Sequence, residues 1–445
     1  MTVPGSLFPV NRCPRPSTYP WKTTLLCVAA TVPGAMAQSI LAPPPAAPAL
    51  VPSAVEEYQT NGQMQVFSPS ATAPPQDDNE SFKCGPVVIR PHIYYQFLYG
   101  SGIVSGPGQS HNTIVQEFAP GVLFDIGSHW TIDYTPTLNF YSNRQFKNTT
   151  DHNVQLQWGT AFHDWFVTAS QSYANTSDPQ VETAGQTDQQ TYNTALNAIY
   201  QFNDKLSADL GVDQNLNYFG QTSTNLVLGL ANSRSWSTTD GLYDQFWPRF
   251  NAGINVGFGY NQQAGSPDSF LQQYQASANW RITDKVSFQL SGGLEDLEYL
   301  SGGSFDILTP IFGGTIQYQP FSQTRISVTA NRTVTTAYYE NEVIEGTSIT
   351  GDFNQRLFGG VYLDLNGGFT TSSYVASIIG LATGRNDDTY SFNVRLTCPF
   401  PKRGTFGIFY QYSNNSSSQT GFAGFGASAF SYSSSQFGFD ISYNY

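Results

Sequence analysis

The last ten residues of the chain, QFGFDISYNY, alternate strictly between apolar and polar side chains. Phe437, Phe439, Ile441, Tyr443 and Tyr445 share one parity, and the positions between them hold polar residues or glycine. A period of two places the two sets on opposite faces of a β-strand. The segment is therefore predicted to be a strand with one apolar face and one polar face.

The same alternation recurs along the chain from about residue 86 onward. It is clearest in WTIDYTPTLNF (130–140), RFNAGINVGFGY (249–260), YQASANWRI (274–282), TRISVTAN (324–331) and TFGIFYQY (405–412). A shift of one residue in any of these strands would turn its whole apolar set to the other face. The pattern predicts an all-β chain built from many strands of similar design.

The links between these strands are predicted to alternate in length. Short links are expected at GSH (127–129), FHD (162–164), NDK (203–205), WPR (247–249), TDK (283–285), PFSQ (320–323), DLNG (364–367) and PFPKRG (399–404). Between them lie longer polar links, such as SYANTSDPQVETAGQTDQQT, YNQQAGSPDS, TTAYYENEVIEGTSITG and SNNSSSQTGFAGFGASAFS. This layout gives about 18 strands of about ten residues, the length that crosses a bilayer at a tilt.

These features predict a transmembrane antiparallel up-and-down β-barrel of about 18 strands, with 16 as the nearest alternative. The short turns are expected in the periplasm together with both chain ends, and the long loops outside the cell. The apolar parity would then face lipid and the polar parity the lumen. The barrel has to close, because an open sheet edge in hydrocarbon leaves backbone groups unsatisfied. A soluble sandwich, propeller or β-helix also shows period two, but it does not explain the alternating link lengths.

Composition supports the β reading and excludes several functions. Only 11% of the residues are charged and 15% are aromatic, and the net charge is −13. Such acidity argues against nucleic acid as a partner. After the first forty residues no apolar run of about 18 residues occurs, so membrane-spanning helices are not expected.

The N-terminal region has the organisation of an export signal. Arg12, Arg15 and Lys22 precede the apolar stretch TTLLCVAATV, and AMA (35–37) supplies a small-residue cleavage pattern. Residues 1–37 are therefore predicted to be a signal peptide, and the Pro/Ala/Ser-rich residues 38–85 a periplasmic tail. Residues 86–445 are expected to form the outer-membrane barrel.

The segment SRSWSTTDGLYDQFWPRFNAGINVGFGY (233–260), together with the barrel layout, resembles a family of outer-membrane β-barrel porins found in exopolysaccharide and other surface-associated loci of Gram-negative bacteria. The resemblance implies an integral outer-membrane location and a channel or export role. The final strand resembles the assembly signal of such barrels. It implies that Phe439, Tyr443 and Tyr445 are recognised by the barrel-assembly machinery.

A set of charged residues falls on the inward parity of the predicted strands. They are Arg90, Arg249, Arg281, Arg325, Arg356, Arg395, Asp125, Asp133, Asp209, Asp213, Glu295 and Asp440. Because most of the arginines lie toward the periplasmic ends of their strands, they are candidates for a basic ring that sorts solutes by charge. Alternatively, the lumen charges pair with neighbours and solvate the wall.

Aromatic residues gather beside the predicted short turns, as expected for a girdle at the membrane interface. The tryptophans of this set are Trp130, Trp165, Trp247 and Trp280. A further group, predicted to lie in loops, could stack on sugar rings and comprises Trp236, Tyr338, Tyr339 and Phe425.

No catalytic, metal or cofactor site is predicted. The sequence contains no GxSxG, HExxH or phosphate-cradling glycine loop. In the adjacent pairs Asp151–His152 and His163–Asp164, side chains on a strand would point to opposite faces and could not act together. Cys84 and Cys398 remain after removal of the signal, and they are expected either to pair or to stay as two free thiols.

The sequence therefore predicts a porin-like channel for passive passage of small hydrophilic solutes, with outer-membrane lipid as its surroundings. Two alternatives stay open. The barrel could be an outer-membrane conduit or accessory barrel for exopolysaccharide export, or a structural or binding barrel with a closed lumen. An enzyme is not expected, because diffusion needs neither nucleophile nor cofactor.

Overall fold

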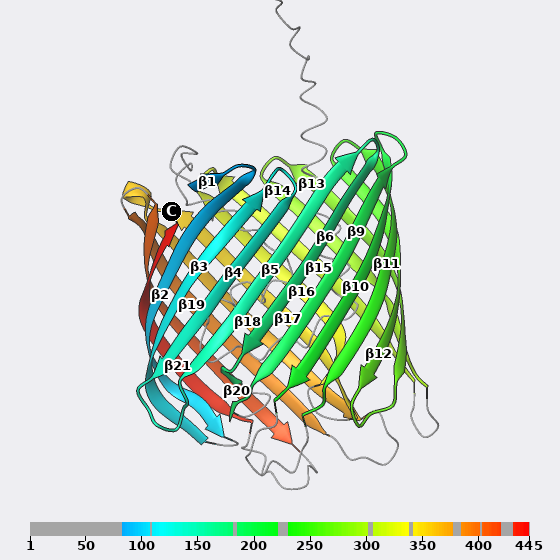
Figure 1. Ribbon diagram of the computed structural model, residues 1–445. Coiled ribbons are helices and arrows are strands. Elements are labelled where there is room, and N and C mark those ends of the chain that lie inside the picture. The colour runs from blue at the N-terminus through cyan, green and yellow to red at the C-terminus, as the bar shows by residue number, and fades with distance from the viewer. Residues whose placement is uncertain are drawn as a thin grey trace, which may run out of the picture.

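A computed structural model of the chain describes residues 82–106, 109–180, 185–220, 230–300, 306–337, 341–376, 384–400, 403–419 and 430–444. The predicted signal peptide, most of the predicted tail, and Tyr338, Tyr339, Phe425 and Tyr445 lie outside these ranges. The described part is almost entirely β-structure, arranged as one 19-stranded sheet and one two-stranded sheet (Figure 1). None of its helices is long and apolar enough to cross a membrane.

The strands follow one another along the chain with a single one-turn 3-10 helix, η2 (Phe358–Gly360), among the described residues. They are β1 (Phe82–Cys84), β2 (Val87–Gly106), β3 (Gln109–Ile126), β4 (Trp130–Tyr141), β5 (Thr149–Phe162), β6 (Trp165–Thr176), β7 (Pro179–Gln180), β8 (Gly185–Gln186), β9 (Gln189–Gln201), β10 (Leu206–Phe219), β11 (Ser233–Trp247), β12 (Phe250–Gln263), β13 (Ser269–Thr283), β14 (Val286–Tyr299), β15 (Ile307–Phe321), β16 (Thr324–Thr336), β17 (Glu342–Arg356), β18 (Tyr362–Ala376), β19 (Arg385–Phe400), β20 (Gly404–Gln419) and β21 (Tyr432–Asn444).

The large sheet closes on itself. Eighteen of its 19 strands pair antiparallel with the strands before and after them, and the short strand β1 adds to the start of β2. The last strand, β21, pairs with both β20 and β2, with Phe439 opposite Phe97 and Tyr443 opposite Ile93. Figure 1 shows this seam, where the blue β2 and the red β21 lie side by side. The predicted closed up-and-down barrel of 18 strands is confirmed.

The two faces of the wall differ as the alternation predicts. In β21, Phe437 and Ile441 have 55% and 43% of their surface exposed on the outside. Gln436 and Asp440, on the other parity, are 4% and 0% exposed and lie on the inner face. The apolar parity therefore faces outward and the polar parity inward.

The strands of the ring are 12 to 20 residues long, longer than the predicted ten. Most of the length comes from segments expected to be loops. In the stretch 335–351, for example, only residues 337–341 link β16 to β17. Hairpins can continue beyond the bilayer, because each strand keeps supplying backbone partners to the next, and Thr and Ser are tolerated in such ladders.

The short turn predicted at DLNG (364–367) is wrong. These residues lie within β18, and the turn that precedes β18 contains η2, with Gly360 at a φ of +82°. Asn366 faces inward, where its side chain donates a hydrogen bond to Asp352 at 2.5 Å. Residues typical of turns occur here because the inner wall is polar, not because the chain reverses.

The sheet begins before the predicted barrel start. β1 pairs with β2 through Phe82–Ile89 and Cys84–Val87, within the segment assigned to the tail. Gly85, at a φ of +62°, makes the intervening turn, a conformation that suits glycine. Cys84 and Cys398 are both free thiols.

Candidate functional site

The wall opens between β15 and β16 at the end of the barrel that carries the long links. The β15–β16 ladder stops at Phe312–Arg332, whereas β15 continues to pair with β14 as far as Ile307–Leu297. The β16–β17 ladder also continues, to Thr336–Val343. Beyond Arg332, therefore, the β16–β17 hairpin separates from β15, while β17 stays paired with β18 as far as Glu342–Ala376.

The described residues of this segment, 333–337 and 341–345, are called the in-folded hairpin below. Its Val334 and Val343 are buried against Leu271, Leu297 and Ile307. Those three side chains lie on β13, β14 and β15 and share the inward parity of their strands. The hairpin therefore packs on the inner face of the wall.

Polar contacts fix both ends of the in-folded hairpin. At its base, Glu345 accepts hydrogen bonds from Arg332 (2.7 Å) and from Thr309 (3.2 Å) on the inner wall. At its tip, the Gln263 side chain donates to the carbonyl of Ala337 at 2.7 Å. The hairpin thus spans the inner face from β16 to the end of β12.

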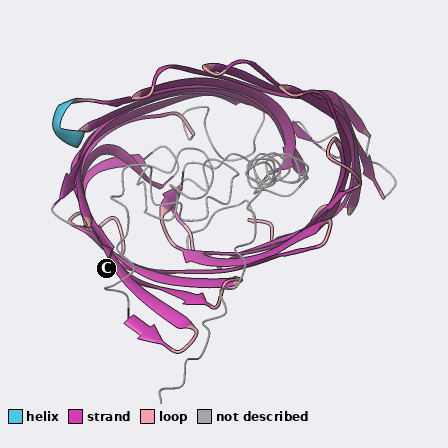
Figure 2. Cartoon of the chain, turned by 90° about the horizontal axis from the view of Figure 1, so that it is seen from above, coloured by secondary structure: helices cyan, strands magenta, loops and turns pink. Residues whose placement is uncertain are grey.

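A second segment lies inside the barrel between β6 and β9. Its Asp178 is buried and accepts hydrogen bonds from Asn139 (3.3 Å) and Tyr141 (3.4 Å) of β4. The backbone N–H of Ser177 donates to Asp151 of β5 at 3.1 Å. The short strands β7 and β8 that follow contact β2, on the far side of β3. Figure 2 shows described segments lying inside the ring.

An apolar cluster covers part of the inner wall at the same end. Its members come from β2 to β4, β20, β21 and the links, namely Leu98, Ile103, Val104, Val115, Tyr141, Phe146, Phe409, Phe430 and Tyr432. Leu230, which precedes β11, packs against this cluster. The sequence analysis assigned the polar parity to the lumen, and these apolar side chains on the inner wall are exceptions to that assignment. Phe146 and Phe430, which lie in links, pack against these inner-wall side chains.

Several of the predicted inward charges form ion pairs. Arg90 pairs with Asp125 at 3.2 Å, and Arg395 of β19 pairs with Asp440 of β21 at 2.7 Å. Arg249 pairs with Asp284, an exposed turn residue, at 3.0 Å. Pairing with neighbours, the alternative considered from the sequence, therefore applies to three of the six arginines.

The remaining three arginines lie near the short turns. Among the described residues, no acidic side chain is within 4.0 Å of Arg281, Arg325 or Arg356. All three are exposed, and the guanidinium of Arg356 lies 5.9 Å from the ring centre of Tyr362.

Three of the predicted inward acids, Asp133, Asp209 and Glu295, are buried and hydrogen-bonded to polar neighbours. Asn197 donates to Asp209 at 2.9 Å and Gln273 donates to Glu295 at 3.3 Å. Asp133 accepts a hydrogen bond from Thr135 at 3.1 Å and lies 3.8 Å from His92. These contacts give each carboxyl a fixed place on the inner wall.

A charged group that the sequence analysis missed lies at the long-link end. Arg385 is buried and pairs with Asp387 at 2.5 Å. Its guanidinium lies 4.2 Å and 3.7 Å from the ring centres of Tyr374 and Phe430. The group was missed because β19 was expected to begin later in the sequence. The alternation of Arg385 and Asp387 on one parity was the available signal.

Two histidines, His92 and His152, lie beside aspartates on the described strands, and neither pair has the geometry of a catalytic base and its orienting carboxylate. His92 contacts Thr135 (3.0 Å) and Asp133 (3.8 Å) through the same nitrogen, Nε2. An activated nucleophile needs the orienting carboxylate on the opposite ring nitrogen. His152 faces outward against Tyr134 while Asp151 is buried inside, as the parity predicts. Within the described ranges no cluster of three or more His, Cys, Asp or Glu could hold a metal.

The predicted interface tryptophans are exposed on the strands next to short turns. The exposed fractions are 44% for Trp130, 39% for Trp165, 63% for Trp247 and 49% for Trp280. Trp236, in contrast, was expected in a loop but lies in β11, stacked on Tyr260 of the outer wall. It is therefore not placed to stack on a sugar inside the barrel.

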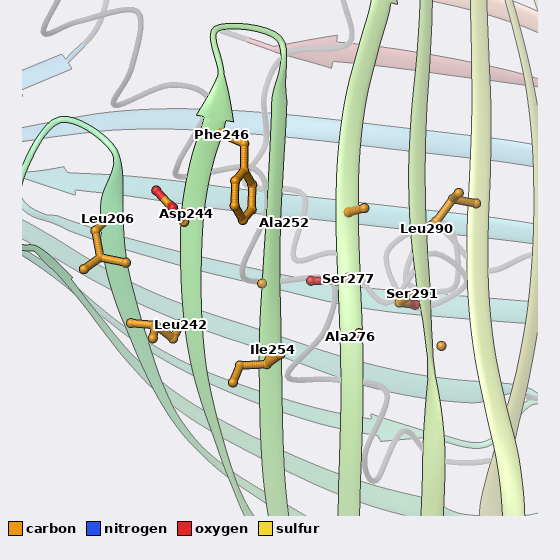
Figure 3. A pocket seen from close by; sticks show the side chains of 13 residues that line it. Leu206, Leu242, Asp244, Phe246, Ala252, Ile254, Ala276, Ser277, Leu290 and Ser291 are labelled. Carbon is orange, nitrogen blue, oxygen red and sulfur yellow. The ribbon is translucent and has the colours of Figure 1, made fainter.

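A shallow groove of about 760 Å³ runs along the outer wall over β10 to β14. Figure 3 shows large side chains such as Leu242, Ile254 and Leu290 at its edges, with Ala252 and Ala276 between them. Two acids of β11 face outward here. Asp244 lines the groove, and Asp240 is exposed on the same face between Trp236 and Phe246.

Comparison with known proteins gives matches to solved structures alone. No family model and no curated protein matches the chain. Similar solved structures include Pseudomonas aeruginosa OpdO (11% identity, TM-score 0.44, covering 80% of this chain and 97% of that one) and Acinetobacter baumannii OccAB3 (9%, 0.44, 80% and 99%). The outer membrane protein OpdK from Pseudomonas aeruginosa also matches (9%, 0.43, 80% and 98%). At TM-scores below 0.5 these likenesses carry no weight for the function of this chain.

Proposed function

We propose that this chain is an integral outer-membrane channel for the passive passage of small hydrophilic solutes. The observation that carries the proposal is the closed 18-strand ring with apolar side chains outside and polar side chains inside. In such a ring neighbouring strands satisfy one another's backbone groups without water, which is the requirement for a β-structure in lipid. A ring of 18 strands is also wide enough to enclose a water-filled path.

The orientation follows the usual design of these barrels. The short turns and both chain ends lie in the periplasm, residues 1–37 are removed on export, and the exposed tryptophans sit at the lipid interface. The barrel-assembly machinery recognises the final strand through Phe439, Tyr443 and Tyr445. Phe439 supports this role because it contacts Phe97 of the first ring strand, with ring centres 5.5 Å apart.

The in-folded hairpin and the segment between β6 and β9 set the width of the path. Both lie at the long-link end and both are fixed to the inner wall by buried contacts. The same segments favour one alternative, a barrel whose lumen is closed until they move. The alternative of exopolysaccharide export rests on the sequence resemblance, since Trp236 lies on the outer wall and Tyr338, Tyr339 and Phe425 lie outside the described residues.

Single-channel recording tests the proposal. Residues 38–445, refolded and inserted into a planar bilayer, are expected to give stable, stepwise currents that tolerate voltage. A sealed bilayer, with circular dichroism and heat-modifiable gel mobility showing a folded barrel, would reject the open channel and favour the closed barrel.

Replacing Asp240 by valine is expected to stabilise the barrel in lipid. Asp240 faces outward between two aromatic levels, so its carboxyl lies in the apolar band. Removing such a group should raise the free energy of unfolding by about 2 kcal/mol. Urea unfolding from lipid vesicles, followed by tryptophan fluorescence, measures the change.

Asp296→Val is the matched control, since Asp296 faces outward near the long-link end of β14 and should have an effect near zero. If Asp240→Val leaves stability unchanged or lowers it, then Asp240 does not face lipid in the membrane.

A further inference from the structure

Four arginines line one arc of the barrel mouth at the short-turn end. They are Arg249, Arg281, Arg325 and Arg356, and together they are called the basic arc. The backbone N–H of Arg281 donates to the carbonyl of Arg249 at 2.8 Å, so these two positions are adjacent. Arg325 of β16 lies opposite Asn354 of β17. Arg356 follows Asn354 by two residues on β17, so both point to the inner face. All four side chains are exposed.

The acidic groups near the basic arc leave it with an excess of positive charge. Asp284 pairs with Arg249. Asp352, deeper in the wall, accepts hydrogen bonds from Ser327 and Asn366, and Asp364 accepts one from Asn354. Lys285, in the turn between β13 and β14, adds a further positive charge and donates to the carbonyl of Pro320 at 2.7 Å.

The N-terminal tail has the opposite charge and is attached at the same end. Residues 38–81 contain no Lys or Arg, and their acids are Glu56, Glu57, Asp77, Asp78 and Glu80. The tail joins the barrel at β1, whose partner residues Val87–Ile89 begin the first ring strand beside the short turns. The tail is therefore tethered at the mouth that carries the basic arc.

We propose that the tail docks on the basic arc through Glu56 and Glu57. β1 pairs with β2, which is eight and nine strands from β12 and β13 and, in the other direction round the ring, six and five strands from β16 and β17. The corresponding spans across the mouth are about 28–35 Å for an 18-strand ring. The roughly 25 residues between Glu57 and Phe82 have a typical end-to-end distance of about 25–30 Å as a flexible chain. Asp77 is separated from Phe82 by too few residues to cross the mouth, since an extended segment of five residues reaches about 17 Å at most.

The contact between the tail and the basic arc is populated because the tail is covalently attached to the barrel at the mouth that carries the arc. Exposed ion pairs are individually weak, but a tethered segment whose length matches the span has an effective concentration in the millimolar range. Docking would place two carboxylates among the arginines and reduce the positive charge at the mouth. The contact does not depend on solute passage, so it stands or falls separately from the proposed channel function.

Site-specific photocrosslinking tests the proposal. The photoreactive residue p-benzoylphenylalanine replaces Tyr58, next to Glu57, in refolded residues 38–445, and mass spectrometry locates the products. Crosslinks are expected at the short-turn ends of β12, β13, β16 and β17. Raising the salt from 0.1 M to 1 M shortens the Debye length from about 10 Å to about 3 Å, so the yield should fall by about fivefold or more.

Charge variants separate the named contact from general attraction. E56Q/E57Q and, separately, R281Q/R325Q/R356Q should each reduce the crosslink by about fivefold, with heat-modifiable mobility showing that the barrel is folded. D77N/D78N/E80Q is the matched control and should leave most of the yield. Crosslinks spread around the mouth, insensitive to salt, or lost equally in the control would overturn the proposal.

Discussion

Deleting residues 335–343 from the in-folded hairpin is expected to raise the single-channel conductance by about twofold or more. The hairpin packs on the inner face of three strands and is tied at its tip to Gln263. Because the β15–β16 ladder already ends at Phe312–Arg332, the deletion removes no backbone pair between these two strands, and β14 and β15 remain paired beneath the hairpin. The change would therefore widen the path without opening the sheet.

A second variant is designed to displace the in-folded hairpin from the inner wall without shortening the chain. Val334→Asp with Val343→Asp places two charges in the apolar contact between the hairpin and the inner wall. This double variant should also raise the conductance. Val328→Ala with Ile349→Ala is the control, because these residues lie on the same two strands but face outward. If both hairpin variants conduct like the parent while the barrel remains folded, the hairpin does not limit the path.

The in-folded hairpin could not be predicted from the sequence. Val334 has the same parity as outward-facing Val328, and Val343 has the same parity as outward-facing Ile349. The period of two continues unchanged past Arg332, so the sequence is typical of a lipid-facing wall on both sides of it. What differs is the loss of β15 as a partner, which depends on the ladder between neighbouring hairpins.

The strands and their faces were predictable because alternation is a local property. It placed Asp440 inside and Ile441 outside, and both placements are confirmed. The turn at DLNG was mispredicted for a related reason. Polar residues and glycine that suggest a reversal are equally suited to a lumen-facing strand, and the sequence alone does not separate the two cases.

The sequence predicted which face of the wall each side chain points to, but not which side chains on the inner face contact each other. Parity placed Arg395 and Asp440 inside, but they lie on β19 and β21, with β20 between them. Gly407 of β20 is opposite Asp440, and a Cβ added to it would lie 2.7 Å from the Asp440 carboxylate. The ion pair crosses β20 because glycine leaves that position empty. This arrangement depends on the register of two ladders together.

Replacing Arg395 by alanine is expected to lower the free energy of unfolding by roughly 3 kcal/mol. Asp440 is fully buried, and its carboxylate lies 2.7 Å from the Arg395 guanidinium. Removing one partner of such a pair leaves the other charge in a site of low polarity, which costs much more than the pair contributes. Urea unfolding from lipid vesicles, followed by tryptophan fluorescence, measures the loss.

A double-mutant cycle separates the interaction energy of the Arg395–Asp440 pair from a general loss of barrel stability. Asp440→Asn should recover most of the stability lost in Arg395→Ala, because the neutral amide no longer requires the guanidinium. Arg281→Ala is the matched control, since Arg281 is exposed and should cost less than about 0.5 kcal/mol. If Arg395→Ala costs no more than Arg281→Ala, the two charges do not stabilise the seam between the last strands and the first. The closure of the ring would then depend on the backbone ladder and the aromatic contacts of β21 alone.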